Sequence, residues 1–308
     1  MNQPLLDHAT RTMAVGSKSF DTAAKLFDAE TRRSALMLYA WCRHCDDVID
    51  DQALGFTTGA ASTTDAQTRL AGLEAQTRQA YAGEPMQVPA FAAFQEVAFK
   101  HAIAPRRAFE HLEGFAMDVR EEHYATFEDT LRYCYHVAGV VGLMMAQVMG
   151  VRDEHVLDRA CDLGLAFQLT NIARDIVEDA HTGRCYLPAS WLAQEGLTVE
   201  TLSDPALRPR VARLAGRLVN EAEPYYASAK AGLAGLPLRS AWAIATAHGV
   251  YRRIGLKVQR AGAHAWDKRQ STSRSEKLAL LAKASALTLS SRVATPEPRP
   301  SGLWQRPA

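Results

Sequence analysis

Residues 45–51 read "CDDVIDD" and place four carboxylates around an apolar Val-Ile pair. Like charges at this spacing repel, and each carboxylate raises the pKa of its neighbours. The stretch before it, "YAWCRH" from Tyr39, has no helix breaker, so the pattern predicts one helix over residues 30–51. At about 100° per residue, one narrow stripe of this helix carries four polar side chains. They are Tyr39, Arg43, Asp46 and Asp50.

A second acidic segment, "QLTNIARDIVED", follows at residues 168–179. Helical spacing again puts its polar side chains on one stripe, which consists of Gln168, Asn171, Asp175 and Asp179. An apolar stripe runs directly beside it and consists of Leu165, Leu169, Ile172 and Ile176. A helix that faces bulk water would put its polar and apolar stripes on opposite sides. The adjacent stripes therefore predict a polar patch at the wall of an apolar cavity.

Either cluster alone is as typical of a solvated helix face as of a binding site. A calcium loop is disfavoured, because no twelve-residue loop punctuated by glycine is present. Carboxylates four residues apart lie on the same face of a helix, and this spacing occurs in both segments. Mg²⁺ takes one or two carboxylates per ion alongside phosphate oxygens. We therefore expect the two stripes to hold Mg²⁺, with Mn²⁺ as the alternative, around a diphosphate.

Composition excludes several classes of protein. The chain has 308 residues, 47% hydrophobic residues and a net charge of +1, so no charge field calls for nucleic acid. Its 5 cysteines are odd in number and irregularly spaced, which favours a reducing compartment over a disulfide framework. The most apolar run, residues 137–151, is shorter than the roughly 18 residues of a membrane span. The start of the chain lacks the apolar core of a signal peptide, so we expect a cytoplasmic protein.

Helical periodicity extends along almost the whole chain, and no alternating strand pattern is convincing. The expected helices lie near residues 4–15, 18–27, 30–51, 65–82, 89–102, 105–121, 127–149, 153–180, 207–232, 238–262 and 274–289. We expect one all-helical domain over residues 1–290. Residues 291–308 include "TPEPRPSGLWQRPA", which is rich in proline, and we expect this tail to be disordered.

Five segments together resemble the squalene/phytoene synthase family, whose members join prenyl diphosphates head to head. They are "SKSF" (17–20), "YAWCRHCDDVIDD" (39–51), "YCYHVAGVVG" (133–142), "QLTNIARDIVEDAHTGRCYLP" (168–188) and "VYRRIGLKVQ" (250–259). Their order and spacing carry the resemblance, which covers roughly residues 10–285. It implies an all-α isoprenoid synthase bundle, a single domain around a central apolar cavity.

The resemblance also assigns roles to single residues. The implied metal ligands are Asp46, Asp50, Asn171, Asp175 and Asp179. The implied contacts to the prenyl diphosphates are Ser17, Tyr39, Arg43, Gln168, Arg174, Tyr251 and Arg269, and Tyr133 joins the four aspartates as a catalytic candidate. Simpler roles stay open for some of them: Ser17 could cap a helix, and Arg43 could pair with Asp47 four residues on.

The reaction implied by the resemblance is the Mg²⁺-dependent condensation of two geranylgeranyl diphosphates to phytoene. It passes through prephytoene diphosphate, releases diphosphate, belongs to carotenoid biosynthesis and needs no NADPH. The small Ala23 and Ala24 after "SKSF" favour C20 chains over C15 chains. The alternatives are a dehydrosqualene- or squalene-type enzyme that uses farnesyl diphosphate, a head-to-tail prenyltransferase, and a non-catalytic partner subunit. Peripheral association with a membrane and contact with other carotenoid-pathway enzymes stay open.

Overall fold

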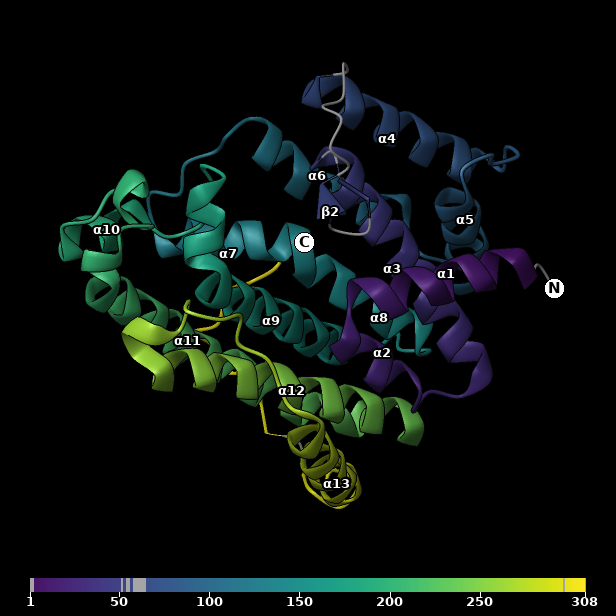
Figure 1. The fold of residues 1–308 in the computed structure, drawn as a ribbon. Coiled ribbons are helices and arrows are strands. Elements are labelled where there is room, and N and C mark those ends of the chain that lie inside the picture. The colour runs from purple at the N-terminus through teal and green to yellow at the C-terminus, as the bar shows by residue number, and fades with distance from the viewer. Residues whose placement is uncertain (1–2, 51, 54–55, 58–64, 296, 308) are drawn as a thin grey trace.

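The long helix α9 (Glu154–His181) occupies the middle of the molecule and carries the second acidic segment (Figure 1). At 1.5 Å per residue its 28 residues span about 42 Å. Asp153 caps its start by accepting from the His155 backbone N–H at 2.8 Å. Buried side chains lie along the whole helix, from Leu157 to Val177, so α9 is a core helix with neighbours on several sides.

The computed structural model describes residues 3–50, 52–53, 56–57, 65–295 and 297–307. The other α-helices are α1 (Gln3–Gly16), α2 (Lys18–Ala24), α3 (Ala29–Ile49), α4 (Ala66–Ala82), α5 (Pro89–His101), α6 (Pro105–Val119), α7 (Phe127–Cys134), α8 (Val140–Val148), α10 (Ala189–Glu195), α11 (Arg208–Ala231), α12 (Leu238–Ala261) and α13 (Arg274–Ser290). The short helical turns are η1 (Tyr135–Gly139), η2 (Val199–Thr201), η3 (Pro205–Leu207), η4 (Gly232–Gly235) and η5 (Gly262–His264). Two short strands, β1 (Gln52–Ala53) and β2 (Phe56–Thr57), pair antiparallel.

The prediction of an all-α fold is confirmed, and α3 shows why the local sequence folds this way. Asp28 caps its start, and the Asp28 carboxylate accepts from the backbone N–H groups of Glu30 and Thr31 at 3.1 and 2.9 Å. The helix then buries Trp41 completely, and the Trp41 ring stacks on Phe94 of α5 with centroids 4.0 Å apart. This packing fixes the rotation of α3 and turns its acidic stripe toward α9.

The predicted helix over residues 127–149 is interrupted. A π-helical turn, η1, separates α7 from α8 and carries Val137 and Ala138 to the cavity wall. Around this turn, backbones approach very closely. A Cβ at Gly164 of α9 would lie 2.3 Å from the carbonyl oxygen of Ala138, and a Cβ at Gly142 of α8 would lie 2.3 Å from that of Ala160. Only glycine allows the helices to cross at this distance.

The C-terminal tail differs from the expectation of disorder. Residues 297–306 pack against α9 and α11, and Leu303 is only 7% exposed. The short helix α10 is a second difference, because residues 189–195 have no predicted counterpart. In the described residues, no helix is both long and apolar enough to cross a membrane. All five cysteines are unpaired.

Candidate active site

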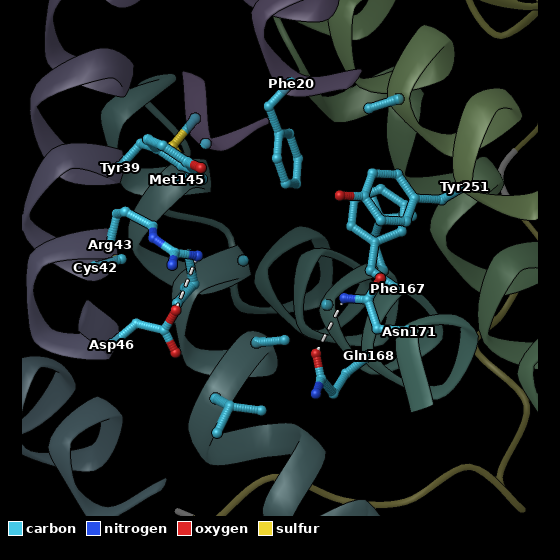
Figure 2. A pocket seen from close by; sticks show the side chains of 18 of the residues that line it. Phe20, Tyr39, Cys42, Arg43, Asp46, Met145, Phe167, Gln168, Asn171 and Tyr251 are labelled. Atoms are coloured by element: carbon cyan, nitrogen blue, oxygen red, sulfur yellow. Dashed lines mark hydrogen bonds and ion pairs between the residues drawn. The ribbon is translucent and has the colours of Figure 1, made fainter. Parts of the chain in front are cut away.

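A cavity of about 910 Å³ lies between α2 and α3 on one side and α8, α9 and α12 on the other. One end is polar and is lined by both predicted aspartate stripes, and the rest is mostly apolar. Figure 2 shows Arg43 and Asp46 of α3 on one side of this space, opposite Gln168 and Asn171 of α9. Of the thirteen predicted site residues, all except Ser17 line the cavity.

The first aspartate stripe is held by arginines. Arg43 contacts the Asp46 carboxylate at 3.0 Å and the Asp47 carboxylate at 2.7 Å, so the salt bridge to Asp47 expected from the sequence is present. Asp50 pairs with Arg184 at 2.5 Å. Burial, opposed by Arg43 and reinforced by Asp50 and Asp47, raises the pKa of Asp46 to about 6. Asp51 lies outside the described residues.

The second aspartate stripe is also paired with arginines and also contains a carboxylate with a raised pKa. Arg174 contacts Asp175 at 2.5 Å, and Arg269 contacts the same carboxylate at 3.2 Å. Burial and the nearby charges of Asp175 and Glu178 raise the pKa of Asp179 to about 7. Both stripes therefore contain a carboxylate whose charged form is disfavoured in the protein alone. An added cation would stabilise that charged form.

The amide of Asn171 fits a cation ligand. Its Nδ2 donates to Gln168 Oε1 at 3.2 Å, which turns Oδ1 the other way, and Oδ1 is buried with no hydrogen-bond partner. A buried acceptor without a partner is costly, and a bound cation would satisfy it. No three metal-binding side chains already surround one point among the described residues. Mg²⁺ needs only one or two protein oxygens per ion and can take others from phosphate groups, so the Asn171 amide and the nearby aspartates fit this ion.

An aromatic cluster lines the cavity beside the polar end. Phe20 lies 5.3 Å from Tyr251 and 6.3 Å from Tyr39 between ring centroids, and Phe167 stacks on Tyr251 at 4.2 Å (Figure 2). Ser17 both caps α2, by accepting from the Phe20 backbone N–H at 3.3 Å, and hydrogen-bonds Tyr251. Neither Phe20 nor Phe167 is among the predicted site residues, although Phe20 ends one quoted motif and Phe167 adjoins another. Their rings would stabilise positive charge on a bound prenyl chain.

A second cluster joins three further residues to Tyr133. The rings of Tyr133 and Tyr186 stack at 4.4 Å, and their hydroxyls donate to the two oxygens of Asp118 at 3.3 and 3.1 Å. Burial raises the pKa of Asp118 to about 6, against the opposing charge of Arg184. All four side chains line the cavity. Arg184 and Tyr186 lie in "GRCYLP", which could have drawn attention to them, whereas only the fold brings Asp118 here.

Comparisons with known proteins agree with this geometry. Residues 13–276 match the Squalene/phytoene synthase family. The chain is 70% identical to 15-cis-phytoene synthase of Pantoea ananas over the full length of both, and 65% identical to phytoene synthase of Pseudescherichia vulneris over 99% of this chain and 98% of that one. A dehydrosqualene synthase crystallised with a ligand superimposes with a TM-score of 0.83 at 27% identity, covering 94% of this chain and 98% of that one. The chain belongs to the squalene/phytoene synthase family.

Proposed function

We propose that this chain is a phytoene synthase that condenses two molecules of geranylgeranyl diphosphate. The observation that carries the proposal is the division of one cavity into an acidic, arginine-lined end and a long apolar remainder. The polar end suits two diphosphates and their cations, and the apolar part suits prenyl chains. The full-length identity of 70% to a 15-cis-phytoene synthase supports the same reaction.

Asp46, Asp50, Asn171, Asp175 and Asp179 would hold the Mg²⁺ ions. Bound Mg²⁺ neutralises the charge that develops on a leaving diphosphate. Arg43, Arg174, Arg184 and Arg269 pair with carboxylates in the protein alone. Once those carboxylates face cations, the same guanidinium groups would donate charge-assisted hydrogen bonds to diphosphate oxygens.

The apolar part of the cavity has to protect carbocations from water. In the first step, loss of one diphosphate leaves an allylic cation, the C2–C3 double bond of the second substrate attacks it, and a proton leaves to close a cyclopropane. In the second step, the remaining diphosphate departs, the skeleton rearranges and a second proton leaves. Two protons and two diphosphates are released, so the balance requires no reductant. The aromatic cluster around Phe20 would face the cationic carbon atoms.

The test is an incubation of purified protein with geranylgeranyl diphosphate and Mg²⁺, without NADPH, followed by extraction of hydrocarbons. The expected product is a C40 triene with the absorption of phytoene. A C30 hydrocarbon formed from farnesyl diphosphate, with no C40 product, would instead assign the chain to the dehydrosqualene-type branch, which the structural likeness to a dehydrosqualene synthase makes the second candidate. No product from either substrate, with the protein folded, would contradict an enzymatic role.

The second half of α12 carries four basic residues, Arg252, Arg253, Lys257 and Arg260. Arg252 pairs with Glu223 at 2.8 Å, and Lys257 pairs with Glu276 at 2.6 Å. These acidic partners offset part of the positive charge and so weaken its attraction to anionic lipid. Peripheral membrane association and contact with other pathway enzymes therefore stay predictions.

A further inference from the structure

The last part of the chain forms a strap, defined here as residues 297–306, over the outer side of α9 and α11. The Trp304 ring lies 5.3 Å from that of Tyr135, and the Trp304 backbone N–H donates to the Tyr225 hydroxyl at 3.2 Å. Leu303 beside it is buried. The strap therefore contributes side chains to the main core, although it has no regular secondary structure.

Charge pairing fixes the strap in one register. Glu154, Asp158 and Asp162 follow one another at intervals of four residues, so they share one face of α9. Arg306 pairs with Glu154 and with Asp158, the latter at 2.6 Å. Arg299 donates two hydrogen bonds to Asp162 at 2.9 and 2.8 Å. These arginines match the acidic face of α9 pair by pair.

Asp162 shows that the strap belongs to the folded protein. Its carboxylate is fully buried and also accepts from Ser228 Oγ of α11 at 2.5 Å. A buried carboxylate that lost its cationic partner would be strongly destabilising. Arg299, which supplies that partner, also donates to the Trp304 carbonyl oxygen at 2.7 Å. The same guanidinium therefore neutralises the Asp162 carboxylate of α9 and joins two positions of the strap, Arg299 and Trp304, by a hydrogen bond.

Arg159 connects the strap to the cavity. Its guanidinium donates to the carbonyl oxygen of Ser228 at 2.9 Å and to that of Glu297 in the strap. Its side chain also lines the cavity. Gly232 makes room for it, because a Cβ there would lie 2.9 Å from Arg159 Cβ. An arginine stem, clamped at its tip by two carbonyl groups, is thus part of the wall of a largely apolar site.

This wall lies far from the aspartates. Arg159 precedes Asp175 by sixteen residues on the same helix, which places it about 24 Å away along the axis. Next to Arg159, the wall of α9 consists of Ala160, Leu163, Gly164 and Phe167, and nearer the aspartates it continues with Gln168, Asn171, Ile172 and Arg174. One turn beyond Arg159, Val156 also lines the cavity. A prenyl chain whose diphosphate sits at Asp175 would therefore extend toward Arg159.

We propose that the strap determines the length of prenyl chain that the cavity accepts, by holding Arg159 in the part of the wall that lies far from the aspartates. The inference rests on the proposed prenyl diphosphate site. The cavity would then act as a hydrocarbon pocket of fixed length. A prenyl chain with one more isoprene unit would be excluded, because the wall at Arg159 is held in place. Release of Arg159 from Glu297 would let the wall retreat and would admit a chain one isoprene unit longer.

The experiment compares binding of C20 and C25 prenyl thiodiphosphates, which do not ionise readily, by calorimetry in the presence of Mg²⁺. The variants are Arg159→Met, a chain that ends at Thr295, and the two changes combined. We expect each change to raise the C25-to-C20 affinity ratio about tenfold. Because both changes act through the same wall, the affinity ratio of the combined variant should be no higher than that of either single variant. The matched control is Arg213→Gln, which removes an exposed arginine pair with Glu195 away from the cavity.

An unchanged affinity ratio in a variant with a lowered melting temperature would overturn the inference, because the strap would then only stabilise the fold. If the shortened chain does not fold, Trp304→Ala replaces it, since this change loosens the strap and keeps both arginine pairs. Failure of the wild-type protein to bind either thiodiphosphate would contradict the proposed function itself. The two failures are therefore distinguishable.

Discussion

The carboxylates at the polar end of the cavity are in an unfavourable state without ligands. Burial raises the pKa values of Asp46 and Asp179 to about 6 and about 7. Nearby arginines offset only part of this cost, and Asn171 Oδ1 has no partner. Such a site is preorganised for cation binding, because a bound cation would relieve the cost of the buried carboxylates and of the unpaired amide oxygen.

Asp46→Asn and Asp175→Asn test the metal-binding role. Each change keeps the shape of the side chain and removes the charge that a divalent cation needs, so turnover should fall by orders of magnitude while the protein stays folded. The measurement is the rate of C40 hydrocarbon formation, with circular dichroism to follow the fold. Asp267→Asn, at a largely exposed aspartate, is the control and should keep full activity. Full activity in both site variants would refute the assignment.

Asp118 makes a separate prediction about pH. Its pKa rises from 3.8 to about 6 in the folded protein, so the native state binds this proton more tightly than the unfolded state. The free energy of unfolding should therefore fall as pH rises from about 4 to about 7. Asp118→Asn should remove up to about 3 kcal/mol of that fall. Urea unfolding of both proteins at the two pH values measures the difference, and equal slopes would contradict the raised pKa.

At the scale of elements, the crossing of η1, α8 and α9 positions the cavity wall. The backbones touch where Gly164 meets the Ala138 carbonyl group, and this contact sets the distance between two helices that both line the cavity. Side-chain packing alone would hold them farther apart. The position of the second aspartate motif relative to the apolar wall thus depends on a contact between two backbones.

Gly164→Ala should destabilise the protein by about 1–3 kcal/mol, because the added methyl group overlaps a backbone carbonyl that cannot move freely. Gly72→Ala on α4 is the matched control, since nothing lies within 4 Å of the position that a Cβ would take there. That change should instead stabilise the helix by roughly 0.5–1 kcal/mol. Thermal unfolding of the two variants measures both effects, and equal melting temperatures would refute the close crossing.

Periodicity predicted the long helices because their apolar faces repeat locally. For the same reason it predicted that the two aspartate stripes lie at the wall of a cavity. It did not predict the break at residues 135–139, since a π-helical turn changes hydrogen bonding without changing composition. It also could not predict the order of the tail. Proline suggested disorder, whereas Arg299 finds its partner Asp162 more than a hundred residues earlier in the chain. Asp118 was missed for the same reason, because its partners Tyr133 and Tyr186 meet it only in the fold.

At the scale of the whole molecule, one cavity of about 910 Å³ would have to hold both substrates. Its volume lies at the upper end of the usual range for ligand pockets. The small side chain of Ala24 on α2 lies in the wall and is 4% exposed. The bulk of residue 24 therefore bears directly on the space left for prenyl chains.

Ala24→Phe should narrow the cavity and lower turnover of C20 substrate relative to C15 substrate by about tenfold or more. The measurement is the ratio of kcat/KM for geranylgeranyl diphosphate to that for farnesyl diphosphate. Ala71→Phe, on an exposed face of α4, is the control for the added bulk. If C20 turnover stayed unchanged with the phenyl ring in the cavity, the small residue at this position would have no part in selecting chain length.

Because α9 carries the proposed cation ligands near one end and Arg159 near the other, its length affects how such an enzyme can diverge. A substitution near Arg159 changes the space for hydrocarbon about 24 Å away from the aspartates, on a rigid helix that transmits little of the change. Descendants of one ancestral gene can therefore drift in the carbon number of their products without passing through inactive forms. New product lengths could then arise while the residues that act on the diphosphates stay unchanged.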